Sequence, residues 1–583
     1  MKILFFSPHS YFTVHALPEK VVANSLKNNG NSIISVGCSG LFADYCICMT
    51  SKKYDASDVF KQKICKECKF NRKNLIRNNE FTNISLDDFI TKSDFYFIDN
   101  ELSKITRVNF IDYLWNDIPI ARYALYEFLL NRKLNSLNFD DDEWKEYQIH
   151  LKNSFLTAIA GDRIFNKFKP DRITTYNSNY SVNHIMCAIA EKNEIPHFSL
   201  HAGGHLKYRL EEMTIFKGYL ASYSWNSQNA WYEYFKFPIS KKSIKYTNQH
   251  INMLLDAKSP WVYSLKSNKK SESYLKNYFG ILANQKVLVA TMSSEDERFG
   301  ADTVKTIPPF QNPIFITNFD WINYLIELVK NEPSFFLIIR VHPREFPNKR
   351  EQVTSKQAKI LESKFVNLPS NIKVNFPKDN ISLHDLIKIT DVCLNSTSTS
   401  GLEFLLFGIP VVIYDRKQLF SYGRELNLIA DSIEEYKIKI IEATNCGKNI
   451  LNIINAYRWL SYRNEVVSIS IKESYKYIYY PKIINKLFLL FEKFYIKNRL
   501  DFFIFKYIYK NYKTNKINKN LNIAIENSLQ SHLDVFNIEN YNKNSSILEK
   551  KLIKESVLKY INKISDPQND PIFRTQIIKM CND

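Results

Sequence analysis

Five hydroxyl side chains stand in a row within residues 395–415, directly before a glycine and a long apolar run. They are Ser396, Thr397, Ser398, Thr399 and Ser400. The apolar run predicts a helix that begins near Ser400, and a helix N-terminus has unpaired N–H groups and partial positive charge that suit a phosphate. The hydroxyls can donate to phosphate oxygens or simply cap the helix. Gly401 would admit a ligand close to the backbone, and Glu403 would accept from ribose hydroxyls or act as a favourable first-turn acid.

A second polar group lies about 55 residues earlier, in FFLIIRVHPRE. Arg340, His342 and Arg344 fall where a predicted strand ends, and a cation with an imidazole can neutralise a phosphate. A third strand end, TMSSEDE, adds Ser293 and Ser294. Because ligands of parallel α/β sheets bind beyond the carboxyl ends of the strands, the three strand ends together predict a phosphate site.

Alternating strands and helices must position these residues. In the second half, the pattern predicts strands at 285–294, 334–343, 391–396 and 409–415, with helices at 318–333, 382–390 and 400–408. In the first half it predicts strands at 2–8, 31–38, 170–178 and 195–204, with helices at 16–30 and 181–194. Such repetition predicts parallel sheets covered by helices on both faces. We therefore expect an α/β protein with two doubly wound, Rossmann-like domains facing each other, at 1–270 and 280–470, and a C-terminal helical extension at 471–583.

The motif pair in the second half also resembles a known family. RVHPRE followed by SLHDLIKITDVCLNSTSTSGLEFLLFGIPVVIYD resembles the donor-binding half of GT-B glycosyltransferases, closest to the bacterial capsule and lipopolysaccharide polysaccharide-synthesis group. Similar His-Pro and Ser-rich motifs in sialyl-, Kdo- and teichoic-acid-type transferases hold a nucleotide-linked donor. The resemblance, over roughly 285–420, implies that His342 and the five hydroxyls contact donor phosphate and that Glu403 contacts the ribose. The resemblance does not fix the nucleotide of the donor, which we expect to be CMP or UDP. A transfer that needs no metal ion suits GT-B enzymes.

The first half is similar to the acceptor domain of the same group. The similar stretches are HSYFTVHALPEKVVANSLKNNGNSIISVGCSG and YNSNYSVNHIMCAIAEKNEIPHFSLHAGGHLKYR. An inverting transfer needs a base that removes a proton from the attacking hydroxyl. His15 and His201 are the candidates for this base, and each could instead make a structural hydrogen bond. Asn177 and Arg209 are candidates for positioning a glycan or glycolipid acceptor.

Five of the nine cysteines fall in one short window of the first half. Cys38 and Cys46 are followed, after a gap, by the pair Cys65 and Cys68 in the spacing of a metal knuckle, and four thiolates suit tetrahedral zinc. The sequence therefore predicts a structural zinc in a Cys-rich insertion at 38–68, with Cys48 as an extra thiol. Free buried thiols are the alternative, and an iron–sulfur cluster is a further one.

Charge and hydropathy limit the classes of partner that the chain can have. The formal net charge is +19, and residues 482–519 hold ten Lys or Arg against two acids, a net of +8. Within this stretch the segment 486–519 is basic, aromatic and amphipathic, which predicts contact with an anionic inner leaflet or packing of helices onto the domains. No apolar run reaches the roughly 20 residues of a membrane span, and the N-terminus lacks a signal-peptide cleavage site. We expect a cytoplasmic protein, peripheral on the inner membrane, without a nucleic-acid partner.

These observations favour a glycosyltransferase that extends a cell-surface polysaccharide, such as capsule or O-antigen, or its lipid-linked precursor. A transferase that uses a CDP-linked polyol-phosphate or sugar-phosphate donor is an alternative, because it would use the same His-Pro and Ser-rich motifs. A nucleotide-sugar epimerase of GT-B fold would turn over its substrate without an acceptor. The charge leaves a nucleic-acid-binding or scaffold protein as the alternative of another class.

Overall fold

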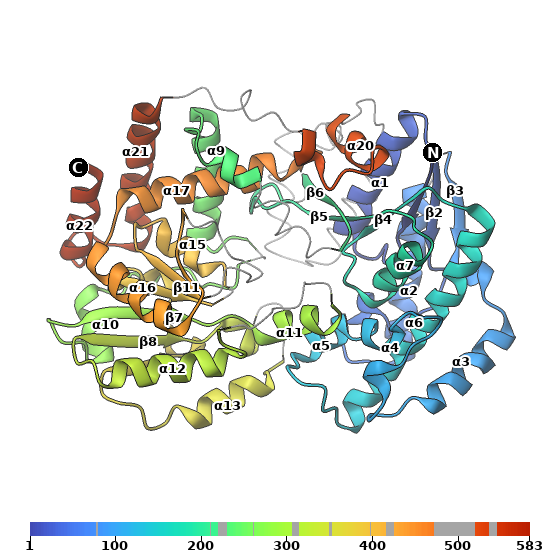
Figure 1. Cartoon of the computed structure of the whole chain (residues 1–583), viewed down its shortest axis with the longest axis horizontal. Coiled ribbons are helices and arrows are strands. Elements are labelled where there is room, and N and C mark those ends of the chain that lie inside the picture. Colours follow the sequence, from blue (N-terminus) through green and yellow to red (C-terminus); the bar gives the residue numbers. More distant parts are fainter. Residues whose placement is uncertain are drawn as a thin grey trace.

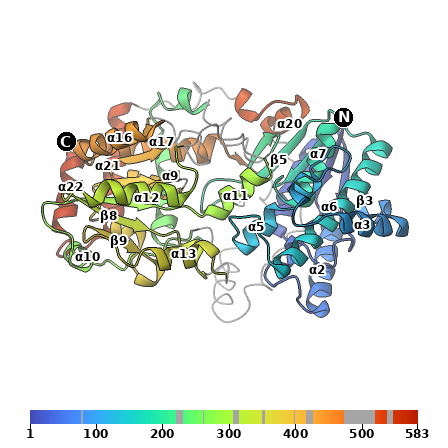
Figure 2. The ribbon, with the colours of Figure 1, turned by 60° about the horizontal axis from the view of Figure 1, so that its bottom comes forward.

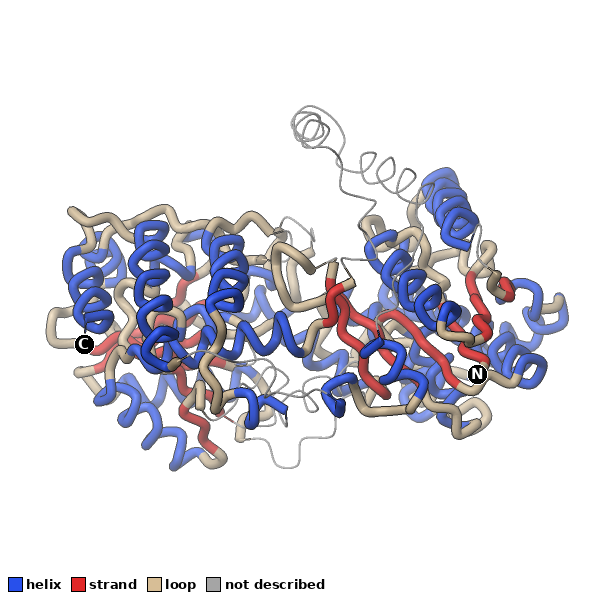
Figure 3. Tube along the Cα trace, turned by 90° about the horizontal axis from the view of Figure 1, so that it is seen from above, coloured by secondary structure: helices blue, strands red, loops and turns tan. Residues whose placement is uncertain are grey.

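The computed structural model describes residues 1–76, 80–209, 211–219, 230–259, 262–305, 314–348, 353–396, 398–414, 425–471, 519–535 and 545–582. They form two α/β domains that lie side by side, with the first domain in blue to teal and the second mostly in green to orange (Figure 1). Each half contains its own group of strands (Figure 3). The predicted fold class, α/β with two doubly wound, Rossmann-like domains, is confirmed by the two sheets.

The first sheet has seven strands in the order β13-β6-β5-β4-β1-β2-β3. The strands from β5 to β3 in that order are parallel, whereas β6 pairs antiparallel with both β5 and β13. Their bounds are β1 Lys2–Phe6, β2 Ser32–Gly37, β3 Thr82–Ser85, β4 Arg172–Tyr176, β5 His197–Ala202, β6 Glu212–Lys217 and β13 Ile469–Ser470.

Alternate residues of β1 show why helices cover both faces of this sheet. Ile3 and Phe5 pack in one buried cluster with Val22 of α1 (Thr13–Asn28). Leu4 and Phe6 pack in another with Phe155 of α6 (Asp141–Phe168). A strand buried on both faces needs a continuous apolar run, as in KILFF. The other helices of this domain are α2 Asp58–Ile76, α3 Lys92–Lys104, α4 Ile120–Tyr123, α5 Tyr126–Arg132 and α7 Ser181–Lys192.

The second sheet has six strands, all parallel, in the order β12-β11-β10-β7-β8-β9. Val287 and Val289 of β7 pack with Leu405 of α15, and Leu288 and Ala290 pack with Leu325 of α12. The strands are β7 Lys286–Thr291, β8 Phe335–Arg340, β9 Ile372–Asn375, β10 Val392–Asn395, β11 Val411–Tyr414 and β12 Leu428–Ala430. The helices are α10 Glu272–Phe279, α11 Glu295–Thr303, α12 Asn318–Lys330, α13 Lys356–Lys364, α14 Leu383–Leu386, α15 Ser400–Leu405, α16 Ile433–Cys446 and α17 Ile450–Ser461.

The chain crosses between the domains more than once. Helix α9 (Lys241–Leu255), inside the predicted first domain, packs on α17 of the second domain and on α21 (Ser546–Ile564) of the C-terminal extension. Strand β13 returns to pair with β6 of the first sheet. Helix α20 (Lys519–Glu526) packs on α1, where Ser25 Oγ donates to Asn522 Oδ1 at 3.0 Å. The described part of the C-terminal extension therefore covers both domains.

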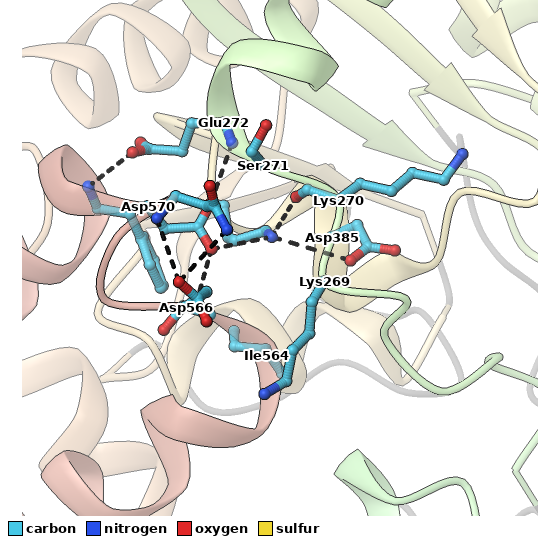
Figure 4. A network of polar contacts seen from close by, with 12 residues as sticks. Lys269, Lys270, Ser271, Glu272, Asp385, Ile564, Asp566 and Asp570 are labelled. Atoms are coloured by element: carbon cyan, nitrogen blue, oxygen red, sulfur yellow. Dashed lines mark hydrogen bonds and ion pairs between the residues drawn. The ribbon is translucent and has the colours of Figure 1, made fainter.

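Helix α22 (Pro571–Asn582) follows α21 against the second domain, where a buried polar network holds the connection between the two helices (Figure 4). Asp570 Oδ1 accepts from the backbone N–H of Glu272 at 3.0 Å, and Asp570 Oδ2 pairs with Lys388 Nζ at 3.3 Å. Glu272 Oε2 in turn accepts from the N–H of Phe573 at 3.2 Å. Backbone N–H groups and Lys388 Nζ thus give these buried carboxylates hydrogen-bond and charge partners, as burial requires.

Helices α5 and α11 meet at the junction of the two domains (Figure 2). Lys133, which follows α5 in the left-handed backbone region, donates through Nζ to the carbonyl of Val353 at 2.6 Å. Among the described residues, no helix combines the length and the apolar character that crossing a membrane would require. The predicted membrane-contact segment 486–519 lies outside the described residues except for Lys519, the first residue of α20.

Candidate functional site

The three predicted polar strand ends are neighbours in space. Strand β7 lies between β8 and β10 in the second sheet. The segments that follow these strands carry Ser293 after β7, His342 after β8 and Ser396 after β10. All three therefore leave the sheet at one edge, the place where parallel α/β sheets bind ligands.

A cavity of about 200 Å³ lies at this edge, between the two domains. Six of the predicted donor-site residues line it: Arg340, His342, Ser398, Thr399, Ser400 and Glu403. The opposite wall includes Arg209, His250 and Arg463. Among the described lining residues there are three arginines and one carboxylate, so the wall is positively charged and suits an anion.

His342 presents a neutral imidazole to the cavity. Its Nδ1 accepts from the backbone N–H of Arg344 at 3.2 Å, which caps the 3₁₀ turn Pro343–Glu345. Burial, and then the neighbouring Arg344 and Arg340, lower the pKa of His342 to about 3. Because Nδ1 is an acceptor, the ring proton is on Nε2, which is left to donate to a ligand. The ring also meets Tyr263 edge to face, with centroids 5.7 Å apart.

Arg340 is held by the end of the neighbouring strand. Its Nη1 donates to Asn375 Oδ1 of β9 and to the carbonyl of Ile381, the latter at 3.0 Å. Burial lowers the pKa of Arg340 to about 10, against the opposing charge of Glu403. The guanidinium therefore stays charged at neutral pH, beside the one carboxylate of the described cavity lining.

Glu403 is fixed by a histidine that sequence reasoning missed. Glu403 Oε2 lies 2.7 Å from Nε2 of His384, which is fully buried in α14. Glu403 Oε1 has no hydrogen-bond partner among the described residues. The pair thus orients a carboxylate with one oxygen left for a ligand. His384 and Glu403 lie on different elements 19 residues apart, and no spacing rule links them.

The predicted hydroxyls divide into two groups. Ser398, Thr399 and Ser400 line the cavity, and Ser398 Oγ accepts from the backbone N–H of Ser400 at 3.2 Å, as a cap would. Ser396 turns inward instead: its Oγ donates to Asn318 Oδ1 at 2.9 Å and lies 3.0 Å from the Tyr414 hydroxyl. Thr397 lies outside the described residues.

Gly401 is required by internal packing. A Cβ at this position would lie 2.9 Å from Asn395 Nδ2 and 3.3 Å from Val411 Cγ1. Asn395 Nδ2 donates to the carbonyl of Ser398 at 2.8 Å, so its position shapes the loop that follows β10. The absent side chain therefore makes room for Asn395. The close approach of a ligand at Gly401, which the sequence suggested, stays a prediction.

Three other predicted donor-site residues do not line the cavity. Ser293 Oγ lies 3.2 Å from Ser396 Oγ in the buried network, and Ser294 Oγ donates to Asp296. Arg344 pairs with Asp296 Oδ2 at 2.8 Å and donates to the carbonyl of Leu130 in the first domain at 3.3 Å. These contacts make Arg344 a link between the domains.

The opposite wall comes from three distant parts of the chain. Arg209 follows β5, His250 lies on α9, and Arg463 lies in the π-helical turn Tyr462–Val466 after α17. A Cβ on Gly204 would lie 2.8 Å from Asn464 Oδ1 and 3.3 Å from Arg463 Nε, so that glycine makes room for the π turn. His250 Nδ1 accepts from the N–H of Leu206 at 3.2 Å. Sequence reasoning missed His250 and Arg463, although π turns are frequent at functional sites.

The two predicted bases lie together beside this wall. His15 stacks on Tyr176 with centroids 4.2 Å apart, and Tyr176 stacks on His201 at 5.6 Å. Burial first, and then the charge of Arg209, lower the pKa of His201 to about 3. Burial, followed by His201, lowers the pKa of His15 to about 3. His201 Nδ1 lies 3.4 Å from the carbonyl of Ala202, so Nδ1 carries the proton and Nε2 is free to accept one.

The cysteine window converges on one small cavity in the first domain. All five side chains line a space of about 20 Å³: Cys38, Cys46, Cys48, Cys65 and Cys68. The cysteines are free thiols. As the side chains stand, no group of three or more His, Cys, Asp or Glu in the described part of the chain has an arrangement that would hold a metal ion.

Comparison with known proteins finds no matching family model and no matching curated protein. Among solved structures, the chain is similar to KpsC, beta Kdo 2,4 transferase, from Thermosulfurimonas dismutans, with 12% identity, a TM-score of 0.29, and 52% of this chain and 87% of that chain covered. It is similar to the glycosyltransferase SnogD from Streptomyces nogalater, with 10% identity, a TM-score of 0.22, and coverage of 80% and 96%. It is also similar to MnaA of S. aureus in a co-structure with UDP, with 10% identity, a TM-score of 0.26, and coverage of 80% and 93%. Likenesses this weak carry no argument about the chemistry of this chain.

Proposed function

We propose that the chain is a glycosyltransferase that moves a sugar from a nucleotide-activated donor to a growing cell-surface polysaccharide or its lipid-linked precursor. The observation that carries the proposal is the interdomain cavity. Its second-domain wall has Arg340, His342 and Glu403 at the carboxyl edge of a parallel sheet, and Arg209 and Arg463 face them. A nucleoside diphosphate or monophosphate has the charge and the hydroxyls that these groups recognise.

In this proposal the cations hold the donor phosphate. Arg209 and Arg463 neutralise its charge from one wall, while His342 donates through Nε2–H from the other. The same groups stabilise the nucleotide as it leaves, when negative charge on the phosphate grows. The transfer therefore needs no divalent cation in this proposal. Glu403 accepts from the ribose hydroxyls through the oxygen that His384 does not engage.

His201 is the base in the proposed reaction. Its Nε2 is unprotonated, the state in which a base must start, and a pKa near 3 makes it weak in the free protein. A bound phosphate would offset Arg209 and Arg463, two cations that lower this pKa. Donor binding would then raise the basicity of His201 when the acceptor hydroxyl arrives. His15, one ring further along the stack, lacks the direct influence of Arg463.

Nucleotide binding tests the proposal. We would measure the melting temperature of the full chain with CMP, CDP, UDP, GDP and ADP, and repeat it with His342→Ala and Glu403→Gln. A ligand at about 100 times its Kd stabilises the native state by about 2.7 kcal/mol. We expect CMP or UDP to raise the melting temperature of the native chain and not of the two variants. Glu362→Gln, on the exposed side of α13, is the matched control and should behave as the native chain does.

The outcome separates the proposal from its rivals. No stabilisation by any nucleotide overturns it. Stabilisation by CDP alone would favour transfer of a polyol-phosphate or sugar-phosphate from the same cavity. Turnover of a nucleotide sugar without any acceptor would identify an epimerase, whereas the proposed transferase releases nucleotide only when a glycan acceptor is present.

A further inference from the structure

The five cysteines of the first domain come from three separate elements. Cys38 directly follows β2, and Cys46 and Cys48 flank the start of the 3₁₀ turn Ile47–Met49. Cys65 and Cys68 lie on α2, three residues apart, so they share one face of that helix. The fold has brought all five thiols to one small cavity, which neither catalysis nor nucleotide binding explains.

The cavity has the size and the lining of a soft-metal site. Its volume of about 20 Å³ is close to the roughly 10–15 Å³ that one water molecule needs. The rest of the lining is Pro8, Gly40, Phe42, Ile64 and Lys69, so sulfur atoms are the predominant potential metal ligands in this cavity. Thiolates bind Zn²⁺ at about 2.3 Å in a tetrahedral set of four.

Backbone donors already point at two of the sulfurs. Cys38 Sγ accepts from the N–H of Gly40 at 3.3 Å, and the backbone N–H groups of Ser10 and Tyr11 interact favourably with a Cys68 thiolate. N–H donors of this kind hold the sulfur atoms of metal sites in place and stabilise thiolate charge. Two cations add to this, since Lys69 lines the cavity and Arg72 lies within electrostatic range of Cys38 and Cys68.

We propose that this cysteine cluster binds one zinc ion, with Cys46, Cys65 and Cys68 as three ligands and either Cys38 or Cys48 as the fourth. As the side chains stand, the Cys48 thiol interacts with the thiols of Cys46 and Cys68. Metal–sulfur bonds replace these thiol contacts, and the thiol protons leave to solvent.

The site has a mechanical role in the first domain. Cys68 contacts the loop between β1 and α1, where its Sγ lies 3.9 Å from the carbonyl oxygen of Pro8. Asn71 on the same helix donates to the carbonyl of Ser10 at 3.2 Å. The loop leads directly into α1, which carries His15. Zinc therefore fixes α2 against the loop that places one of the two stacked histidines.

Metal content of the full chain is the first test. We expect about one zinc per chain by inductively coupled plasma mass spectrometry after dialysis, and loss of it in Cys65→Ser and in Cys68→Ser. Cys187→Ser and Cys446→Ser, outside the cluster, are the controls and should keep the metal. Of Cys38→Ser and Cys48→Ser, one should lose zinc and the other keep it. Iron with acid-labile sulfide in place of zinc overturns the proposal.

A second measurement on the native chain covers the case in which the variants do not fold. A mercurial reagent titrates the thiols while released zinc is followed with a colorimetric chelator. We expect the cluster thiols to react slowly, zinc to appear as they are modified, and a chelator to lower the melting temperature. Rapid reaction of all the cluster thiols, with no zinc released and none taken up when Zn²⁺ alone is added, overturns the proposal.

Discussion

The two walls of the interdomain cavity are built in different ways. The second-domain wall is short in sequence: Arg340 ends β8, His342 follows it, and Glu403 follows β10, which lies on the other side of β7 in the same parallel sheet. The opposite wall joins Arg209, after β5, to Arg463, more than 250 residues later in a π turn. The second-domain wall can be inferred from the order of the strands in one sheet. The opposite wall forms only where the chain, having crossed between the domains, brings distant residues together.

The difference shows what a strand-end motif can determine. Parallel strands place their carboxyl ends at one edge, so residue spacing within βαβ units carries over into spatial proximity. It does not determine which side chain at that edge turns towards the ligand. His342 and Arg344 are two residues apart in one turn, yet one lines the cavity and the other joins the domains.

Arg344 should have the largest effect on stability. Arg344→Ala removes the cation from a buried pair with Asp296 and should lower the free energy of unfolding by about 3–5 kcal/mol. Urea denaturation of the variant measures this. Nucleotide affinity of the folded fraction should change less than about 3-fold, because Arg344 does not line the cavity.

His342→Ala is the matched comparison from the same turn. The free energy of unfolding should stay within about 1.5 kcal/mol of the native value, because a hydrogen bond such as that between His342 and Arg344 contributes no more than this. Nucleotide binding should weaken. If Arg344→Ala abolished binding without loss of stability, the assignment of Arg344 to stability and of His342 to nucleotide binding would be wrong.

Arg463 tests whether the unpredicted wall matters as much as the predicted one. Arg463→Ala should weaken binding of a nucleoside diphosphate by about 2–3 kcal/mol, or roughly 30- to 150-fold, because it removes a charge partner of the phosphate. Isothermal titration calorimetry measures this, with the matching nucleoside showing no change. Arg107→Ala, exposed on the first domain, is the control cation. Equal losses for nucleoside and diphosphate would mean that Arg463 does not contact phosphate.

The sequence allowed more of the fold than of the site to be predicted. Predicted strands at 285–294 and 391–396 contain β7 and β10, because buried parallel strands are apolar runs bounded by turns. The helices predicted at 382–390 and 400–408 are shorter, as α14 and α15. Nothing local indicated that β13 would return to the first sheet, since its two residues gain their pairing only from β6.

His384 should have a smaller effect, because it acts through Glu403. His384→Ala removes the hydrogen bond that orients the carboxylate and should weaken nucleotide binding by about 1–2 kcal/mol, or roughly 5- to 30-fold. His384→Gln, which can still donate from a similar position, should recover part of the affinity. In a Glu403→Gln background, His384→Ala should add little. Full additivity of the two changes would show that the residues act independently.

The pH dependence of donor binding should be the smallest effect. Burial with the neighbouring arginines lowers the pKa of His342 to about 3, and burial lowers the pKa of His250 well below its usual range. Both rings then stay neutral between pH 5.5 and 8. A nucleotide sugar keeps its own phosphate charge over that interval, so calorimetry should give a Kd that varies less than about 3-fold.

If the Kd for the donor does change with pH, the direction of the change is informative. The buried histidines should contribute a fall in the free energy of unfolding as the pH falls from about 6.5 towards 3, because they bind protons in the unfolded chain and stay neutral in the folded one. Binding must therefore be measured where the chain remains folded. If the affinity rose steadily as the pH fell through 6.5, a histidine of the protein would be taking up a proton from solvent when the donor binds. In that case the arginines would not account for the whole of the phosphate recognition, and His342→Ala should abolish the rise.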